Sequence, residues 1–166
     1  MTTFNRRTLL LTGGVLLAGA ASATGYSLWG GMSEEEARPF YTEDGVALRG
    51  TDPVAYFTES EPTPGSAEFA ADWNGATWHF ASAENRDQFL ADPEAYAPQF
   101  GGFCAWAVAE KGELYSTDPT AWKIVDDKLY LNFNAGIQKK WEKDIPGFIK
   151  AADNRWPDIL AEAQAS

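Results

Sequence analysis

The chain of 166 residues has few of the side chains from which reactive or metal-binding sites are built. It contains one cysteine, Cys104, one histidine, His79, and two methionines. A single cysteine excludes an intrachain disulfide framework, so the fold must be held together by its hydrophobic core. The same scarcity leaves Cys104 and His79 as the candidate catalytic residues and as the candidate ligands of a soft metal ion.

Basic residues are also few. The chain has 13 Lys and Arg against 24 Asp and Glu, which gives a formal net charge of -11. Two of the arginines, Arg6 and Arg7, lie in the N-terminal segment. A surface with this much negative charge repels phosphate backbones and anionic lipid headgroups. Nucleic acid is therefore excluded as a partner. Cations, a basic protein partner or solubility remain as reasons for the charge.

The sequence contains no phosphate-binding loop, nucleophile elbow, zinc-protease helix or Cys-x-x-Cys motif, so an ordinary hydrolase or disulfide oxidoreductase is not expected. Aromatic residues, in contrast, are abundant, with 7 Trp, 6 Tyr and 10 Phe. Buried rings supply much of the apolar area of a small core. The length fits a single domain with a core of its own.

The N-terminus has the pattern of an export signal. Arg6 and Arg7 precede an uncharged stretch over residues 8–32, and this order of a charged and an apolar region is typical of signal peptides. The arginine pair followed by leucines resembles a twin-arginine signal, and the small residues 21–23 predict cleavage after Ala23. An uncleaved segment would anchor the domain in the membrane. Either outcome predicts a periplasmic domain, with 1–23 as signal, 24–39 as tether and 40–166 as the single domain.

Local patterns predict an α+β fold in which small antiparallel hairpins pack with short helices. Residues 69–73 and 78–80 alternate around Asn74-Gly75, a pair that accepts the positive φ angles of a type I′ turn. Ser82 is the expected N-cap of the helix that follows. Aspartate precedes proline at 52–53, 92–93 and 118–119, where the carboxylate can cap a helix, and the last two pairs each predict a short turn of helix.

The C-terminal part is predicted to close the domain. Residues 122–125 and 128–133 are rich in β-prone side chains and flank Asp126-Asp127, which predicts a second hairpin. Residues 137–143 and 148–156 predict two helices that follow it.

Three segments resemble the YHS domain: Thr51–Phe57, Trp73–Ser82 and Phe89–Tyr96. The likeness extends over residues 46–133 and is greatest to an exported branch of that family. In that branch, the segment that reads Gln99–Ala107 here follows the helix, and Asp-Pro-x-x-Trp and Leu-Tyr-Leu-Asn segments close the domain. The resemblance implies an exported α+β domain of unassigned activity. Selenocysteine occurs in this branch, which by analogy implies redox or metal chemistry.

Metal-associated YHS domains carry cysteine at three positions that read Ala55, Ala81 and Asn85 here. Alanine has no ligand atom, and a neutral amide is a poor partner for a soft metal ion, so the thiol site of the family does not transfer. A copper or zinc site would then depend on Cys104 and His79, and two ligands make an incomplete site.

These observations favour a binding module that holds a small ligand or a metal ion in a pocket formed by residues 101–107 and the hairpins. The glycine pair in that segment lets backbone pass close to a ligand. The expected ligand-binding residues are Gly101, Gly102, Cys104, Trp106 and Tyr56.

Two other functions remain open. One is a thiol-dependent redox or enzymatic accessory, with Cys104 as the thiolate and His79 as the candidate base. The other is a protein-interaction domain that uses the acidic surface. Both candidate side chains also have plain structural interpretations, because free cysteine is commonly buried and His79 is expected on the outer face of its strand.

Overall fold

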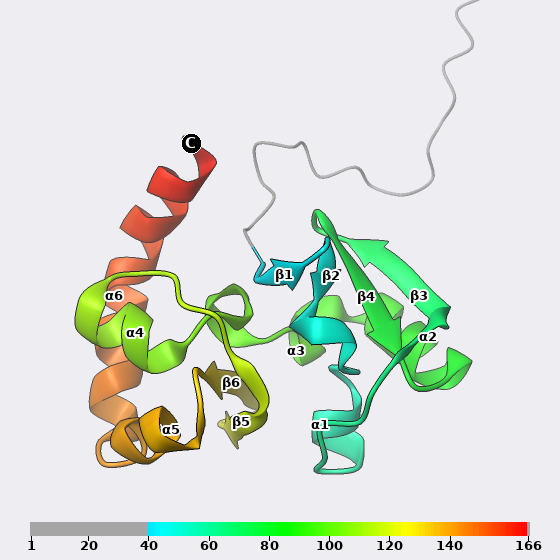
Figure 1. Ribbon diagram of the computed structural model, residues 1–166, viewed down its shortest axis with the longest axis horizontal. Helices are drawn as coiled ribbons and strands as arrows, with labels where there is room; N and C mark the ends of the chain where they lie inside the picture. The colour runs from blue at the N-terminus through cyan, green and yellow to red at the C-terminus, as the bar shows by residue number, and fades with distance from the viewer. Residues whose placement is uncertain (1–39, 166) are drawn as a thin grey trace, which may run out of the picture. The chain divides into compact units, whose positions relative to one another are not determined.

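The computed structural model describes residues 40–165, which lie within one compact unit. The predicted signal segment and tether lie outside the described residues. The fold is α+β, as the sequence predicts, with strands and helices in mixed order (Figure 1). Within residues 40–165, no helix is both long and apolar enough to cross a bilayer.

The first sheet has four strands in the order β1-β2-β4-β3. Its hairpin, β3 and β4, turns at Asn74 and Gly75 with φ angles of 50° and 79°, so the predicted turn is confirmed. Trp78 and Phe80 are fully buried on one face of β4, while the alternate residues are partly exposed. The strands are Thr42–Glu43 (β1), Val46–Ala47 (β2), Ser66–Trp73 (β3) and Ala76–Phe80 (β4).

Short helices follow or interrupt this sheet. Ser82 begins α2 as predicted, because its hydroxyl accepts a hydrogen bond of 3.1 Å from the backbone N–H of Asn85. Pro93 begins α3, although the side chain of Asp92 makes no capping bond there. The elements are Leu48–Gly50 (η2), Ala55–Thr58 (α1), Ala83–Ala91 (α2) and Pro93–Tyr96 (α3).

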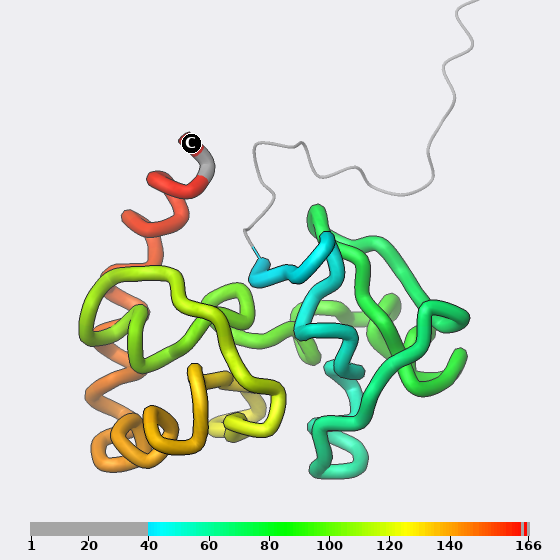
Figure 2. Tube along the Cα trace, in the orientation of Figure 1, coloured from blue at the N-terminus to red at the C-terminus, as the bar shows by residue number. Residues whose placement is uncertain are grey.

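After α3 the chain forms a 3-10 helix, η3, a separate hairpin of β5 and β6, and the helices α4, α5 and α6 (Figure 2). The helix predicted at Asp118-Pro119 is wrong: β5 begins at Asp118, which pairs with Asn132 of β6. Cross-strand pairing thus overrides the local signal. The last helix also begins earlier than predicted, with Asp144 as its cap. The elements are Gln99–Gly102 (η3), Ala105–Lys111 (α4), Asp118–Val125 (β5), Lys128–Asn132 (β6), Ala135–Trp141 (α5) and Ile145–Gln164 (α6).

Strand β6 divides the interior between two hydrophobic clusters. Leu129 and Leu131 belong to the cluster around Trp78 and Phe89. Tyr130, which points to the opposite face of the strand, belongs to the cluster around the helices. Because side chains alternate along a strand, Asn132 shares the face of Tyr130. Helices α4 and α6 lie side by side in this second cluster (Figure 1).

Candidate functional site

A fully buried carboxylate, Asp52, joins α1 to the end of β4. Its Oδ1 accepts hydrogen bonds from the backbone N–H groups of Val54 at 2.8 Å and Ala55 at 3.4 Å. Its Oδ2 accepts from the backbone N–H of Ala81 at 2.8 Å and from Nδ2 of Asn85 at 2.7 Å. The carboxylate therefore does more than cap a helix, because both of its oxygens are satisfied by protein donors.

The three positions at which metal-associated YHS domains carry cysteine all converge on this carboxylate. Ala55 and Ala81 donate through their backbone, and Asn85 donates through its side chain. The two alanines present no ligand atom, and a neutral amide is a poor partner for a soft metal ion. The residues present at these positions therefore do not fit a soft metal ion, and they take part instead in hydrogen bonds to Asp52.

Cys104 forms a second buried centre. In the sequence it lies between η3 and α4, and 1% of its surface is exposed. The backbone N–H of Phe133 donates a hydrogen bond to Sγ at 3.3 Å. The thiol in turn lies 3.8 Å from Oδ1 of Asn132, at the limit for a weak S–H donor. Oδ1 also accepts from the backbone N–H of Trp106 at 3.3 Å. The cysteine is thus held between α4 and the end of β6.

Asn132 leaves this centre incomplete. The residue is fully buried, and its Nδ2 has no hydrogen-bond partner among residues 40–165. Two donors already meet Oδ1, so the amide orientation that satisfies them points Nδ2 away from both. An unpaired buried donor of this kind costs about 1–3 kcal/mol. The Cys104 centre therefore carries a polar cost that the Asp52 centre does not.

The thiol is held mainly in its protonated form. Burial raises the pKa of Cys104, and the backbone N–H groups of Ala107, Phe133 and Trp106 lower it in part, together with the charge of Lys111. Oδ1 of the Asn132 side chain also favours the protonated thiol, because this oxygen can accept a hydrogen bond from the thiol and would repel the thiolate.

A pocket of about 210 Å³ opens beside the thiol. Its other walls come from α4, from the segment after α4 and from the start of α5. Phe133 is 45% exposed and lies at the pocket. Lys111 is drawn over the ring of Tyr115, where its Nζ donates to the phenol oxygen at 3.0 Å. The lining residues are mostly apolar: Cys104, Trp106, Ala107, Lys111, Tyr115, Phe133 and Ile137.

Of the residues that the sequence analysis proposes for ligand binding, the structure places Cys104 and Trp106 at this pocket and the others elsewhere. Gly101 lines a second, larger cavity of about 780 Å³. Gly102 has a φ of 77°, and a Cβ there would lie 3.2 Å from Pro98, so this glycine is needed for packing.

Tyr56 and His79 also lie away from the thiol pocket. Tyr56 is fully buried, its hydroxyl donates to the carbonyl of Pro119 at 2.9 Å, and its ring packs edge-on against Trp122. His79 is partly exposed on β4 and lines no part of the thiol pocket. Among residues 40–165, no three His, Cys, Asp or Glu side chains gather as a metal site.

Sequence reasoning missed Asn132, Phe133 and Ile137. Asn132 ends the buried Leu-Tyr-Leu-Asn strand, and a polar residue at the end of a buried strand was the available signal. Its contact with Cys104 spans 28 positions in the chain, so local patterns could not reveal it.

Comparison with known proteins gives one family. No curated protein and no solved structure matches the chain. The thiol pocket lies outside the segment that the family covers, whereas Ala55, Ala81 and Asn85 lie inside it. Residues 54–100 match the YHS domain.

Proposed function

We propose that the protein is a binding module for a small, mainly apolar ligand held in the pocket beside Cys104. One observation carries the proposal: a buried thiol lines a cavity of about 210 Å³ whose other walls are mostly apolar side chains. A dry cavity of about 150 Å³ is large enough for benzene. The pocket therefore suits a molecule between a single ring and a fused pair of rings.

The thiol gives this pocket its chemical character. Sulfur is polarisable and makes favourable contacts with aromatic rings of about 0.3–1.5 kcal/mol. Phe133 and Tyr115 add two rings in edge-on contact, with centroids 6.5 Å apart. An aromatic ligand would meet both the sulfur and these rings, and a charged ligand would lose its hydration without a matching partner among the apolar walls.

Ligand-induced stabilisation tests this proposal. The melting temperature of the purified protein is measured with benzene, phenol and indole, and separately with zinc and Cu(I). We expect indole or phenol to raise the melting temperature in a concentration-dependent way, since a ligand that binds only the folded state stabilises it. Ile137→Trp, which fills the pocket, should abolish the shift, whereas Lys139→Trp on the exposed face of α5 should retain it. No shift with any of the three rings would contradict the proposal.

The melting measurements with zinc and Cu(I) test the alternative that the ligand is a metal ion. The YHS family is associated with metal-related proteins, so the match to residues 54–100 supports a metal-binding module in outline. Cys104 is the one soft donor at the pocket among the described residues. A metal-induced shift that Cys104→Ser abolishes would transfer the proposal from an apolar ligand to a metal ion.

Thiol-dependent chemistry is the second candidate function. It is favoured by the N–H groups of Phe133, Ala107 and Trp106, which lower the pKa of Cys104 against the effect of burial. His79 does not line the pocket, so it is not placed to act as a base for the thiol. Alkylation of the native protein by iodoacetamide as a function of pH separates the candidates. A rate that is already at its plateau at neutral pH would favour a working thiolate, and a rate that rises up to strongly alkaline pH would exclude it.

Export to the periplasm also stays a proposal, based on the twin-arginine pattern at residues 6–7. Cell fractionation of the full chain tests it, with Arg6→Lys and Arg7→Lys as the paired variant. Retention of the paired variant in the cytoplasm is expected, and unchanged export would contradict it.

A further inference from the structure

A second cavity of the described chain lies apart from the thiol pocket. It has a volume of about 780 Å³, within the range of about 300–1,000 Å³ that is usual for ligand sites. It shares none of its lining residues with the thiol pocket. The cavity extends from the first sheet and α3 to the β5–β6 turn and α6, so both halves of the domain contribute to it.

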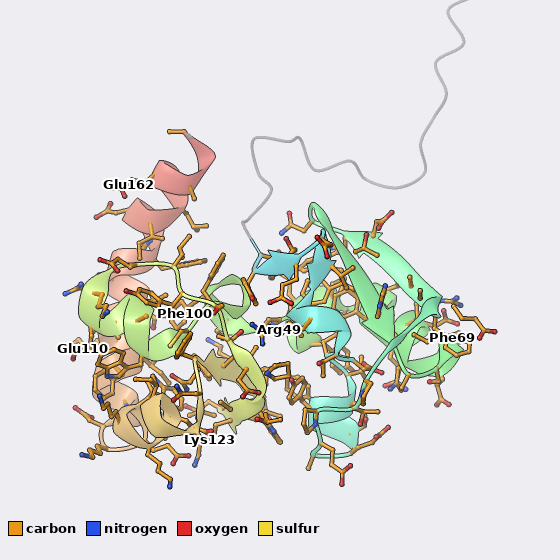
Figure 3. All side chains as sticks on the ribbon, viewed as in Figure 1. Arg49, Phe69, Phe100, Glu110, Lys123 and Glu162 are labelled. Atoms are coloured by element: carbon orange, nitrogen blue, oxygen red, sulfur yellow. The ribbon has the colours of Figure 1, made fainter. Side chains whose placement is uncertain are left out.

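Aromatic rings form much of the wall of this cavity. They occur as three packed pairs from different elements, with ring centroids 5.4, 5.5 and 5.6 Å apart. Phe100, labelled in Figure 3, is buried and packs against Trp156 of α6. Each ring packs against its partner, and such packing lowers the conformational entropy that the rings lose when a ligand binds. The six residues are Phe40 with Trp73, Phe57 with Tyr96, and Phe100 with Trp156.

Carboxylates from three elements surround the same space. Glu94 comes from α3, Asp126 and Asp127 from the β5–β6 turn, and Asp153 from α6, while Lys128 is the basic residue among the lining side chains of the described chain. The three aspartates form no ion pair with another described residue. Carboxylates that line a concave surface focus a negative potential within it.

The pKa of a neighbouring phenol reflects this field. Burial, and then the charges of Asp153 and Asp126, raise the pKa of Tyr130 to about 12. Two aspartates on different elements therefore act on the same buried ring, and their field reaches the protein interior as well as the cavity.

We propose that this cavity binds a small organic cation, such as a quaternary ammonium or a substituted amine. Aromatic faces attract such cations through their quadrupole, and the attraction is largest when the cation is desolvated against several rings. The carboxylates supply the opposite charge at the rim. A compact metal ion fits less well, because no three His, Cys, Asp or Glu side chains gather in the described residues.

Choline and its neutral isostere 3,3-dimethylbutan-1-ol distinguish charge recognition from simple apolar binding. Calorimetric titration of the purified full chain should give a dissociation constant for choline that is at least about tenfold lower than that of the alcohol. Raising the salt concentration from about 20 to about 200 mM should weaken choline binding several-fold and leave the alcohol unchanged. Equal affinities for the two probes, or no binding of choline at about 10 mM, would overturn the proposal.

Charge-neutralising variants locate the site. Asp126→Asn and Asp153→Asn together should weaken choline binding about fivefold or more, since both charges face the cavity. Asp126 has a φ of 50°, which asparagine tolerates, so the turn should be preserved. Asp44→Asn together with Asp158→Asn, two exposed residues outside the lining, removes the same number of charges as a control and should leave the affinity unchanged. Equal losses in both cases would show a general charge effect and contradict the site.

Fluorine NMR of the 5-fluorotryptophan-labelled protein supplies a readout independent of affinity. Choline should shift the resonances of Trp73 and Trp156, which line the cavity, and leave that of the fully buried Trp141 in place. Trp156→Phe assigns one resonance and keeps an aromatic ring in position. Shifts confined to other tryptophans would place the cation elsewhere and overturn the proposal.

Discussion

The two buried polar centres of this domain differ in how completely they are satisfied. Asp52 receives N–H donors on both carboxylate oxygens and adjoins the segment that matches the YHS domain. Cys104 lies outside that segment. It adjoins a cavity and the Asn132 amide nitrogen, which has no partner among residues 40–165. Closed networks fix a fold, whereas open ones tend to mark functional sites. The comparison therefore points to a structural role for the first centre and supports the binding that we propose for the second.

Removal of the Asp52 carboxylate should have the largest effect. Asp52→Ala leaves several buried N–H groups without an acceptor, and the free energy of unfolding should fall by about 3 kcal/mol or more. Urea denaturation followed by tryptophan fluorescence measures the loss. Asp44→Asn, in an exposed turn, should change the stability by less than about 0.5 kcal/mol. A loss at Asp52 no larger than that of the control would remove the distinction between the centres.

Asn85→Ala tests the Asp52 centre with a smaller change. It removes one charge-assisted hydrogen bond to Asp52 but leaves the backbone donors in place. Hydrogen bonds to charged groups contribute about 1.5–3 kcal/mol, so the loss should be smaller than that of Asp52→Ala. If urea denaturation shows no loss, Asn85 does not take part in the closed network.

Cys104→Ser should be tolerated better. A serine hydroxyl can accept from Phe133 and donate to Asn132, so the partners of the thiol remain available. The shorter C–O bond places the oxygen less well, and we expect a loss of roughly 1 kcal/mol. The same denaturation measurement checks this value. A loss equal to that of Asp52→Ala would show that both centres are structural.

Alkaline pH should reveal that Cys104 of the second centre, and Tyr130 of β6, are held in their protonated forms. The pKa values of Cys104 and Tyr130 are raised by burial, so the folded protein holds protons that the unfolded chain has released. Their contribution to stability is fully present below the pKa values of the unfolded chain and is lost as the pH rises through the folded values, for Tyr130 about 12. Denaturation midpoints measured between about pH 7 and 11 should fall.

Cys104→Ala is the control for this titration. It removes the thiol's share of the alkaline fall and leaves that of Tyr130. An identical pH dependence in the variant and the parent protein would show that Cys104 titrates alike in the folded and unfolded states.

Local signals explain which parts of the fold could be predicted. Asn74-Gly75 and Ser82 act within a few residues of themselves, and both were predicted correctly. Asp118-Pro119 was not, because β6 draws Asp118 into a strand through a partner 14 positions away. The candidate site shows the same limit. Cys104 and Trp106 were expected from the sequence, whereas Asn132 reaches them only through the position of β6 against α4.

Access to the native thiol tests the central claim most directly. The rate at which methyl methanethiosulfonate, a small reagent, forms a mixed disulfide with Cys104 is measured at increasing urea concentrations below the unfolding transition. An open pocket predicts a rate that is independent of urea in this range, much faster than that of the larger 5,5′-dithiobis(2-nitrobenzoate), and slowed by Ile137→Trp. If the rates of both reagents instead rise steeply with urea concentration, starting from the lowest concentration and with the same dependence, only unfolding exposes the thiol. That result would contradict the account.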